Sequence, residues 1–390
     1  MMSRFLFFLV CIPLVTLLVL AQEPSTAEIQ ELTTRNAEFA GQLYRAIART
    51  TDDNVLISPF TISLGLASLM TGAKDSTYKQ LLQGLNLNNL DQERIPDLFN
   101  SVRNSVTQTG FVNQGIGLFP AQQFKVDPTY RDLVQTKYGV TVQGLDFNDS
   151  KDTVNQFVST KTGDKVTEVV SDIDSQTQMM LITAVFFQGQ FALDFNASFT
   201  QEERFYVNKY NIVTVPMMFR SDKYHLAYDS SLKLGILKLP MTGGAAMLVL
   251  LPDEDVDYTS IDEEITGRRF QGWLKQLKRT KLEVQLPRFM LEKSYSLQKI
   301  LPGMGFSQVF QESADLSGIG GETNLTLSEV VHKAAIAVDE TSSAGNARAS
   351  IVFASLPPRL TINRPYLFLV YDQVTSSLLL MGRVTDPTKQ

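Results

Sequence analysis

The stretch that most constrains the fold is Met179–Phe191, MMLITAVFFQGQF, which is rich in β-branched and aromatic residues and does not alternate polar with apolar positions. A strand with one solvated face alternates, whereas a continuous apolar run is typical of a strand covered on both faces. We therefore predict a strand in the middle of a sheet, with other elements packed against both sides of it. A chain of 390 residues is long enough to build such a fold.

Helical patterns dominate the first half of the chain and strand-like runs dominate the second half. Phe39, Leu43 and Ile47 recur every four residues, and Ser58-Pro59 is typical of a helix N-terminus. Further helices are predicted at 76–84, 91–107, 127–138, 151–163 and 259–279, and further strands at 205–210, 212–219, 224–228, 232–240, 245–251, 282–290, 330–338, 360–362, 366–371 and 377–384. No linker, repeat or βαβ rhythm divides the sequence, so we expect one α+β domain over residues 22–390.

The first 21 residues are typical of a secretory signal peptide. Arg4 supplies the positive charge, Phe5–Leu20 is almost wholly apolar, and Ala21 offers a small residue before the expected cleavage point. An uncleaved anchor is the alternative, although the apolar run is slightly short for a membrane-spanning helix. We therefore expect a secreted, extracellular protein without a membrane segment in the mature chain.

The only cysteine, Cys11, lies within this signal peptide. The mature chain is therefore predicted to contain no disulfide, no thiolate metal site and no cysteine nucleophile. Asparagines in the pattern N-x-S/T, which are predicted glycosylation sites in a secreted protein, occur at Asn148, Asn196 and Asn324.

Residues 341–357 are polar and rich in small side chains, yet they alternate like a strand. One set of alternate positions is small or apolar: Ser343, Gly345, Ala347, Ala349, Ile351 and Phe353. The other set includes Asn346, Arg348 and Ser350. Two interpretations remain open: a loop that can become a half-buried strand, or a solvated linker whose alternation is accidental.

The sequence carries no signature of a common enzyme class. It has only two histidines, His225 and His332, and it lacks G-x-S-x-G, Walker A, H-E-x-x-H and Gly-rich dinucleotide motifs. We predict a protein that is not an enzyme and holds no metal. A hydrolase built on two carboxylates is the alternative, because such acids meet in space rather than in sequence.

The net charge of −6 argues against a general nucleic-acid-binding protein. One local basic cluster nevertheless follows residue 267, and on a continuous helix Lys275, Lys278 and Arg279 would share one side. A solvated helix face is one interpretation. The other is a site for an anionic partner such as a heparin-like sulfated glycan.

Several motifs, in order along nearly the whole mature chain, resemble those of the serpins. The carrying segments are NVLISPF at 54–60, LITAVFFQG at 181–189, ADLSGI at 314–319, VHKA at 331–334, NRPYLF at 363–368 and MGRV at 381–384. The resemblance implies an α+β serpin fold with three β-sheets, eight to nine helices and an exposed reactive-centre loop.

It also implies a secreted, monomeric inhibitor of serine proteases that requires no cofactor. The target protease would cleave the loop, which then inserts as a new strand into the large sheet. Matching positions give a loop hinge at Glu340, Ser343, Gly345 and Ala347, and a sheet-opening region at Ser58, Thr183 and His332. A non-inhibitory serpin acting as a carrier or binding protein is the alternative.

The reactive bond is placed at Ala354–Ser355 by anchoring on the following Leu356-Pro357-Pro358. Counting the family's usual spacing from Glu340 places it instead at Leu356–Pro357, so the loop is about two residues short on that count. A small residue before the cut favours an elastase-like target, and cleavage after Phe353 favours a chymotrypsin-like one.

A finer resemblance, to secreted serpins that act in blood coagulation with a protein Z-like cofactor, rests on NKY at 208–210, VPMM at 215–218 and WLK at 273–275. It implies a factor Xa-like protease as a further target. Matching positions for the cofactor are Lys209, Tyr210, Glu263 and Asp52, whereas Arg49 replaces an apolar residue of the pattern.

Overall fold

The computed structural model describes residues 23–108, 110, 112–321, 325–340 and 356–390. The predicted signal peptide lies outside these residues. Among the described residues, no helix combines the length and the apolar character needed to cross a membrane.

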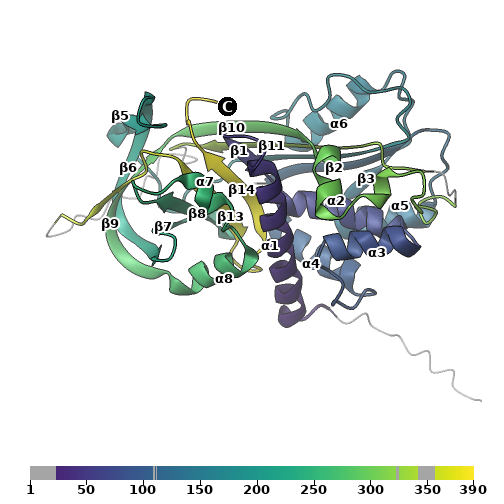
Figure 1. Ribbon diagram of the computed structural model, residues 1–390, viewed down its shortest axis with the longest axis horizontal. Helices are drawn as coiled ribbons and strands as arrows, with labels where there is room; N and C mark the ends of the chain where they lie inside the picture. The colour runs from purple at the N-terminus through teal and green to yellow at the C-terminus, as the bar shows by residue number, and fades with distance from the viewer. Residues whose placement is uncertain (1–22, 109, 111, 322–324, 341–355) are drawn as a thin grey trace, which may run out of the picture.

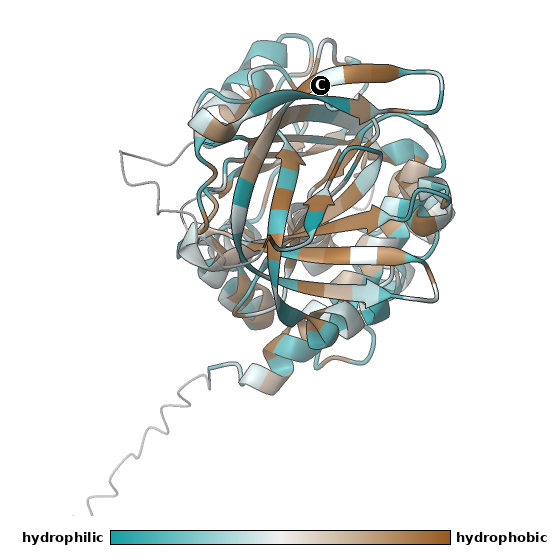
Figure 2. Ribbon diagram, turned by 90° about the vertical axis from the view of Figure 1, so that its left-hand side faces the viewer, coloured by the Kyte–Doolittle hydropathy of each residue, from teal (hydrophilic) through white to brown (hydrophobic). Residues whose placement is uncertain are grey.

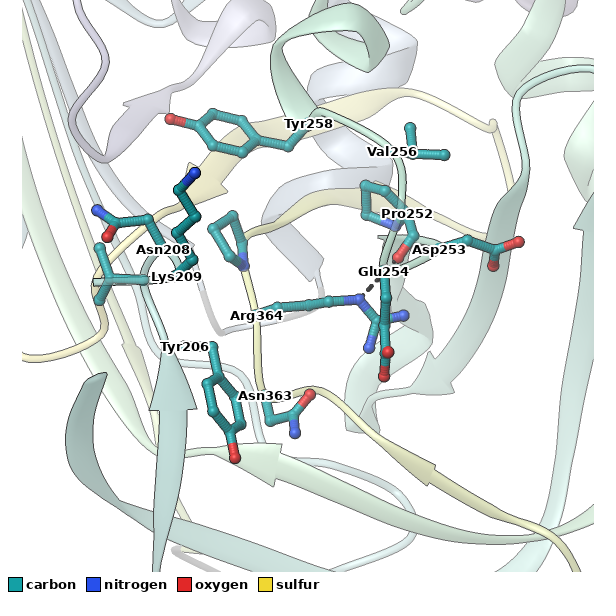
Figure 3. A pocket seen from close by; sticks show the side chains of 12 residues that line it. Tyr206, Asn208, Lys209, Pro252, Asp253, Glu254, Val256, Tyr258, Asn363 and Arg364 are labelled. Atoms are coloured by element: carbon teal, nitrogen blue, oxygen red, sulfur yellow. Dashed lines mark hydrogen bonds between the residues drawn. The ribbon is translucent and has the colours of Figure 1, made fainter. Parts of the chain in front are cut away.

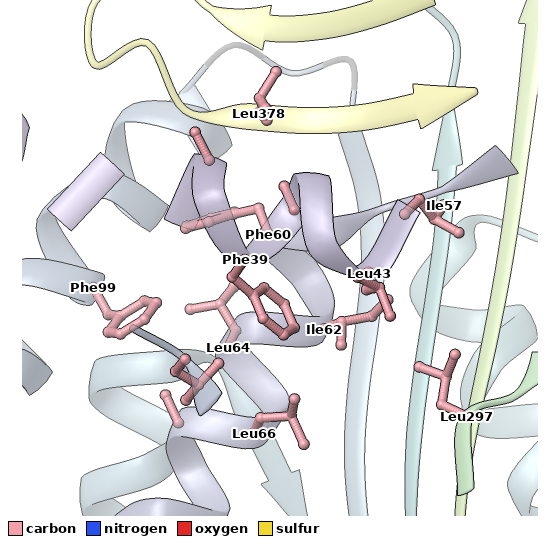
Figure 4. Close-up of a cluster of buried hydrophobic side chains, with 14 of the residues drawn as sticks. Phe39, Leu43, Ile57, Phe60, Ile62, Leu64, Leu66, Phe99, Leu297 and Leu378 are labelled. Atoms are coloured by element: carbon pink, nitrogen blue, oxygen red, sulfur yellow. The ribbon is translucent and has the colours of Figure 1, made fainter. Parts of the chain in front are cut away.

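Eight α-helices occur in the described part of the chain: α1 Thr26–Ala48, α2 Pro59–Gly72, α3 Asp75–Gly84, α4 Ile95–Gln108, α5 Pro128–Tyr138, α6 Lys151–Thr162, α7 Tyr258–Asp262 and α8 Gly267–Gln276. α1 begins with a capping box in which Ser25 and Glu28 bond each other's backbone groups. α2 is buried along nearly its whole length, as its continuous apolar sequence predicts, and Figure 4 shows its side chains packed against those of α1, α4 and β14.

The strands are β1 Val55–Ile57, β2 Val112–Pro120, β3 Val140–Val142, β4 Met179–Phe187, β5 Gln201–Tyr206, β6 Ile212–Asp229, β7 Leu234–Pro240, β8 Ala245–Pro252, β9 Lys278–Pro287, β10 Phe289–Ser296, β11 Glu329–Val338, β12 Arg359–Thr361, β13 Tyr366–Asp372 and β14 Leu378–Val384. One sheet has the order β10-β11-β4-β2-β3. The other runs β1-β14-β13-β8-β7-β6-β9-β12, with β5 paired to β6. Figure 2 shows the hydrophobic and hydrophilic stripes that alternate along several of these strands.

The described residues thus form two continuous sheets, where three were expected. The reason is the length of β6, whose 18 residues pair with β9 over one part and with β7 over the other. The two expected smaller sheets are therefore joined through one pair of long, bent strands (Figure 1).

β4 is the strand predicted from the continuous apolar run, and all nine of its residues are buried. Met180, Ile182 and Ala184 contact the cluster that includes α6, whereas Met179 and Leu181 belong to the cluster of α1 to α5. Figure 1 shows α6 on one side of this sheet and α2 to α5 on the other. The strand ends at Phe187, earlier than predicted, and Phe191 forms only an isolated bridge with Met241.

The predicted helix over 259–279 is wrong in its extent. The segment contains two helices, α7 and α8, because the side chain of Thr266 accepts a hydrogen bond from the backbone N–H of Arg269 and begins a new helix. α8 ends at Gln276, and Lys278 is the first residue of β9. Lys278 and Arg279 are therefore on a strand and do not share a helix face with Lys275.

Candidate loop-insertion site

The seam between β4 and β11 is the central feature of the five-stranded sheet. The two strands are parallel and paired over eight positions, from Glu329 opposite Met180 to Ile336 opposite Phe187. The loop after β11 must turn back on itself to approach this seam, so a strand made from it would be antiparallel to both neighbours. Antiparallel pairing is slightly more stable per residue than parallel pairing. A strand inserted at this seam would therefore replace one parallel pairing with two antiparallel pairings.

His332 and Thr183 lie directly opposite each other in the middle of this seam, and both side chains are fully buried. The backbone N–H of Ser58 donates to His332 Nε2 at 3.0 Å, so Nε2 is an acceptor and the ring proton is on Nδ1. Nδ1–H then donates to Thr183 Oγ1 at 2.9 Å, and the Thr183 hydroxyl donates to the carbonyl of Val331 at 3.3 Å. Every polar group of the histidine is satisfied when the ring is neutral.

Burial lowers the pKa of His332 to about 3, which is consistent with this neutral tautomer. Ser58 extends the network away from the sheet, since its hydroxyl donates to the carbonyl of Leu379 at 2.7 Å. Thr61, one turn along α2, lies 2.8 Å from the Ser58 hydroxyl and donates to Gln114 Oε1 on β2 at 2.8 Å. The network thus ties α2, β2, β4, β11 and β14 together at the seam. The residues with hydroxyl groups beside His332, Ser58 and Thr183, are buried like the ring itself, so we assign the ring a positioning role.

Glu340 marks the point where the chain leaves β11. Its side chain is only 9% exposed, and its carboxylate accepts a hydrogen bond from Thr200 Oγ1 at 2.5 Å and lies 3.5 Å from Arg288 Nη1. At the other end of the loop, Leu356 is 90% exposed and the carbonyl of Pro358 accepts from the backbone N–H of Glu283 at 3.0 Å. The loop therefore begins beside the seam and ends on the other sheet.

The remaining predicted loop residues, Ser343, Gly345, Ala347, Ala354 and Ser355, lie outside the described residues. Their alternation stays a prediction.

The sequence matches the family described as Serpin (serine protease inhibitor) over residues 34–387. This chain is a serpin. It is 32% identical over 370 residues to mouse protein Z-dependent protease inhibitor, covering 92% of this chain and 83% of that protein. It is 33% identical over 364 residues to human plasma serine protease inhibitor, covering 90% of this chain and 89% of that protein.

The structural comparison agrees with the sequence comparison. The crystal structure of mouse protein Z-dependent protease inhibitor superposes with a TM-score of 0.87 at 30% identity, covering 93% of this serpin and 100% of that chain. Human kallistatin superposes with a TM-score of 0.84 at 28% identity, covering 93% of this serpin and 99% of that chain. The predicted family and its finer resemblance are both confirmed.

Of the four residues matched to a cofactor surface, Lys209 lines a cleft of about 590 Å³ (Figure 3). Lys209 lines one side, next to Tyr210, whose ring is 86% exposed and lies 4.8 Å from the Lys209 ammonium. Tyr258 lines the other side, and its hydroxyl donates to the Asp52 carbonyl at 3.4 Å. The structure thus brings together segments that the sequence separates widely.

The Glu263 carboxylate already forms an ion pair within the chain. Arg49 donates to both of its carboxylate oxygens, at 2.7 and 2.5 Å, and this pairing lowers the pKa of Glu263. Arg49, which departs from the family pattern, therefore pairs with Glu263, one of the two acids matched to the cofactor surface.

Asn148 is exposed and its amide donates to Asp146 at 2.8 Å, whereas Asn196 is half-buried and accepts from the backbone of Ser198. Asn324 lies outside the described residues. Within the described residues, no group of three or more His, Cys, Asp or Glu side chains is placed to hold a metal ion.

Proposed function

We propose that this serpin is a secreted, monomeric suicide inhibitor of a serine protease, acting through cleavage and insertion of loop 341–357. The observation that carries the proposal is the parallel β4–β11 seam with the hinge Glu340 at its open end. The serine of the protease forms an ester with the carbonyl carbon of Ala354 while the Ala354–Ser355 peptide bond breaks and the amino group of Ser355 leaves. The loop then inserts antiparallel between the two strands, and the attached protease moves with it.

The driving force is the gain of one strand in a sheet. Each added backbone hydrogen bond contributes about 1 kcal/mol net, and each buried apolar side chain adds about 25 cal/mol per Å² removed from water. These gains must exceed the loss of the eight β4–β11 pairings and of the hydrogen bonds of His332. The small inward residues predicted at 343, 345, 347 and 349 reduce the steric cost of inserting the first residues of the loop.

The test is incubation with chymotrypsin-, elastase- and factor Xa-like proteases, followed by electrophoresis in SDS. We expect a covalent complex with at least one protease, and mass spectrometry of the released fragment to place the cut at Ala354–Ser355. If every protease only nicks the loop and regains full activity, inhibition is refuted and the carrier function is favoured.

The proposal includes a role in coagulation control with a protein Z-like cofactor that contacts Lys209, Tyr210, Asp52 and Glu263. It is supported by the similarity to protein Z-dependent protease inhibitors and by the exposure of Tyr210. We expect protein Z to accelerate inhibition of the factor Xa-like protease, and Tyr210→Ala to remove the acceleration without changing the rate measured in its absence. A heparin-like glycan is proposed as an optional cofactor that basal inhibition does not require.

A further inference from the structure

Tyr258 lies in the most acidic stretch of the chain. Six of the ten residues within five positions of it are acidic and none is basic. None of the other tyrosines has more than two acidic residues within that distance. The sequence around Tyr258 is therefore unlike that around any other tyrosine of the chain. The six acids are Asp253, Glu254, Asp255, Asp257, Asp262 and Glu263.

The structure brings this stretch to the surface. Glu254, Asp255 and Asp257 are exposed, and Tyr258 lines the cleft of about 590 Å³. Figure 3 shows the Tyr258 ring on one wall of the cleft, with its hydroxyl directed toward the side where Lys209 lies. The phenol is thus accessible from the cleft, in a setting rich in carboxylates.

The backbone around Tyr258 belongs to a short, weakly held segment. Residues 253–257 form no helix or strand, and α7 spans only five residues. The Tyr258 hydroxyl donates a long hydrogen bond, 3.4 Å, to the Asp52 carbonyl. A helix of about one turn is marginal without tertiary contacts, so local opening here costs less than opening of a strand. A modifying enzyme can therefore reach the phenol while both sheets stay folded.

We propose that Tyr258 is a site of tyrosine O-sulfation and that the sulfate pairs with Lys209 across the cleft. The phenol oxygen attacks the sulfur of a nucleotide phosphosulfate and forms a new S–O bond. The bond from that sulfur to the bridging oxygen breaks, the nucleotide leaves with the electron pair, and the phenol proton passes to a base of the transferase. The proposal rests on the secretion proposed above, because sulfation of tyrosine takes place in the secretory pathway.

The acids around Tyr258 explain why this tyrosine is selected. A transferase that binds a polyanionic nucleotide donor has a basic active site. Carboxylates around the acceptor steer the tyrosine toward such a site and complement its charge. The exposed tyrosines Tyr206, Tyr210 and Tyr228 each have a lysine within five positions and lack this complementarity.

Lys209 is the cation that the new sulfate would meet. Its side chain is exposed, its ammonium lies 4.8 Å from the Tyr210 ring centroid, and it forms no ion pair with any described residue. The second cation of the cleft, Arg364, already donates to the carbonyl of Pro252 at 2.9 Å. A sulfate ester keeps its negative charge at every physiological pH and supplies acceptor oxygens for a charge-assisted hydrogen bond from Lys209.

The test begins with the full chain secreted from animal cells and analysed by mass spectrometry. We expect the peptide that contains Tyr258 to gain the mass of one sulfuryl group, and the gain to resist phosphatase. Chlorate, which blocks synthesis of the sulfate donor, should remove it, as should Tyr258→Phe. Tyr210→Phe, at a tyrosine that is 86% exposed, should keep it. A gain that phosphatase removes, or one that persists in Tyr258→Phe, would overturn the proposal.

A second assay does not depend on secretion. The purified, unsulfated full chain is incubated with a tyrosylprotein sulfotransferase and its phosphosulfate donor. The double variant Asp255→Asn, Asp257→Asn should be sulfated about tenfold more slowly, because steering by complementary charge is lost. Asn at 257 still caps α7, and the exposed Asp152→Asn is the matched control. Absence of the protein from the medium would count against secretion, whereas no transfer in this assay would refute the site.

The pairing with Lys209 has its own readout. Brief acetylation of the sulfated and unsulfated proteins, followed by mass spectrometry, measures the reactivity of each lysine. We expect sulfation to slow acetylation of Lys209 about two- to fivefold, as an exposed ion pair allows, and to leave the distant, exposed Lys151 unchanged. Equal reactivity of Lys209 in the two forms would overturn the pairing. Urea unfolding of each variant checks that the fold is kept.

Discussion

The ring of His332 donates from Nδ1 to the hydroxyl of Thr183 at 2.9 Å across the one seam that loop insertion must open. Insertion starts from the Glu340 end, where Ile336 faces Phe187, and meets this pair half-way along. The hydrogen bond thus contributes to holding the seam closed before cleavage, and its strength contributes to the barrier to insertion.

Replacing Thr183 with the isosteric valine should destabilise the protein by about 1–3 kcal/mol, because the buried Nδ1–H of His332 loses its acceptor. Urea unfolding at pH 7.5 measures the loss. Thr34→Val is the matched control, since it removes an exposed hydroxyl that bonds only within α1. Equal effects of the two substitutions would contradict a special role for the seam.

Acid should lower the free energy of unfolding of the protein through the same histidine. The folded-state pKa of His332 is about 3, below its unfolded value of about 6.5, so the unfolded chain binds a proton in this range and the folded chain does not. This contribution to stability is complete above pH 6.5 and is lost as the pH falls towards 3. The slope approaches about 1.4 kcal/mol per pH unit.

The carboxylates of the protein add their own pH dependence, so His332→Gln is the reference. The difference between the unfolding free energies of the two proteins should change between pH 7 and pH 4.5. A constant difference would show that the ring is protonated in the folded state.

The sequence predicted β4 and the family because both depend on local patterns: an unbroken apolar run and short ordered motifs. It did not predict the partners of Glu340, because Thr200 is 140 positions away and no local pattern marks either residue. The interpretation of Lys278 and Arg279 as helical failed because a basic, amphipathic stretch looks similar whether the helix ends at 276 or at 279. His225 and Lys238 become neighbours only through the register of β6 with β7, which the sequence does not reveal.

Release of the hinge should make the seam easier to open. Glu340→Ala removes both the hydrogen bond from Thr200 and the ion pair with Arg288, whereas Arg288→Gln removes only the ion pair with a half-exposed partner. We expect about 1–2 kcal/mol of lost stability for the first and under about 1 kcal/mol for the second. The rate of thermal aggregation, followed by light scattering, should rise in the same order.

The alternation of the loop predicts which substitutions block insertion. Ala349→Arg puts a charge on the inward set and should prevent the rise in unfolding temperature that follows loop cleavage. Ser350→Arg, one position along on the outward set, should leave that rise intact. If both variants gain stability on cleavage, the predicted inward face is wrong.

Arg49 offers the sharpest test of the cofactor surface. Its bidentate pairing with Glu263 is on the surface, where such a pair contributes at most about 1 kcal/mol, so Arg49→Leu should leave the fold intact. The substitution frees the Glu263 carboxylate and places an apolar side chain where the family pattern has one. We expect tighter binding of protein Z, measured by surface plasmon resonance. The double variant Arg49→Leu, Glu263→Gln should lose part of that gain, because the freed carboxylate is then absent. If Arg49→Leu weakens binding, the ion pair itself is part of the surface that the cofactor contacts.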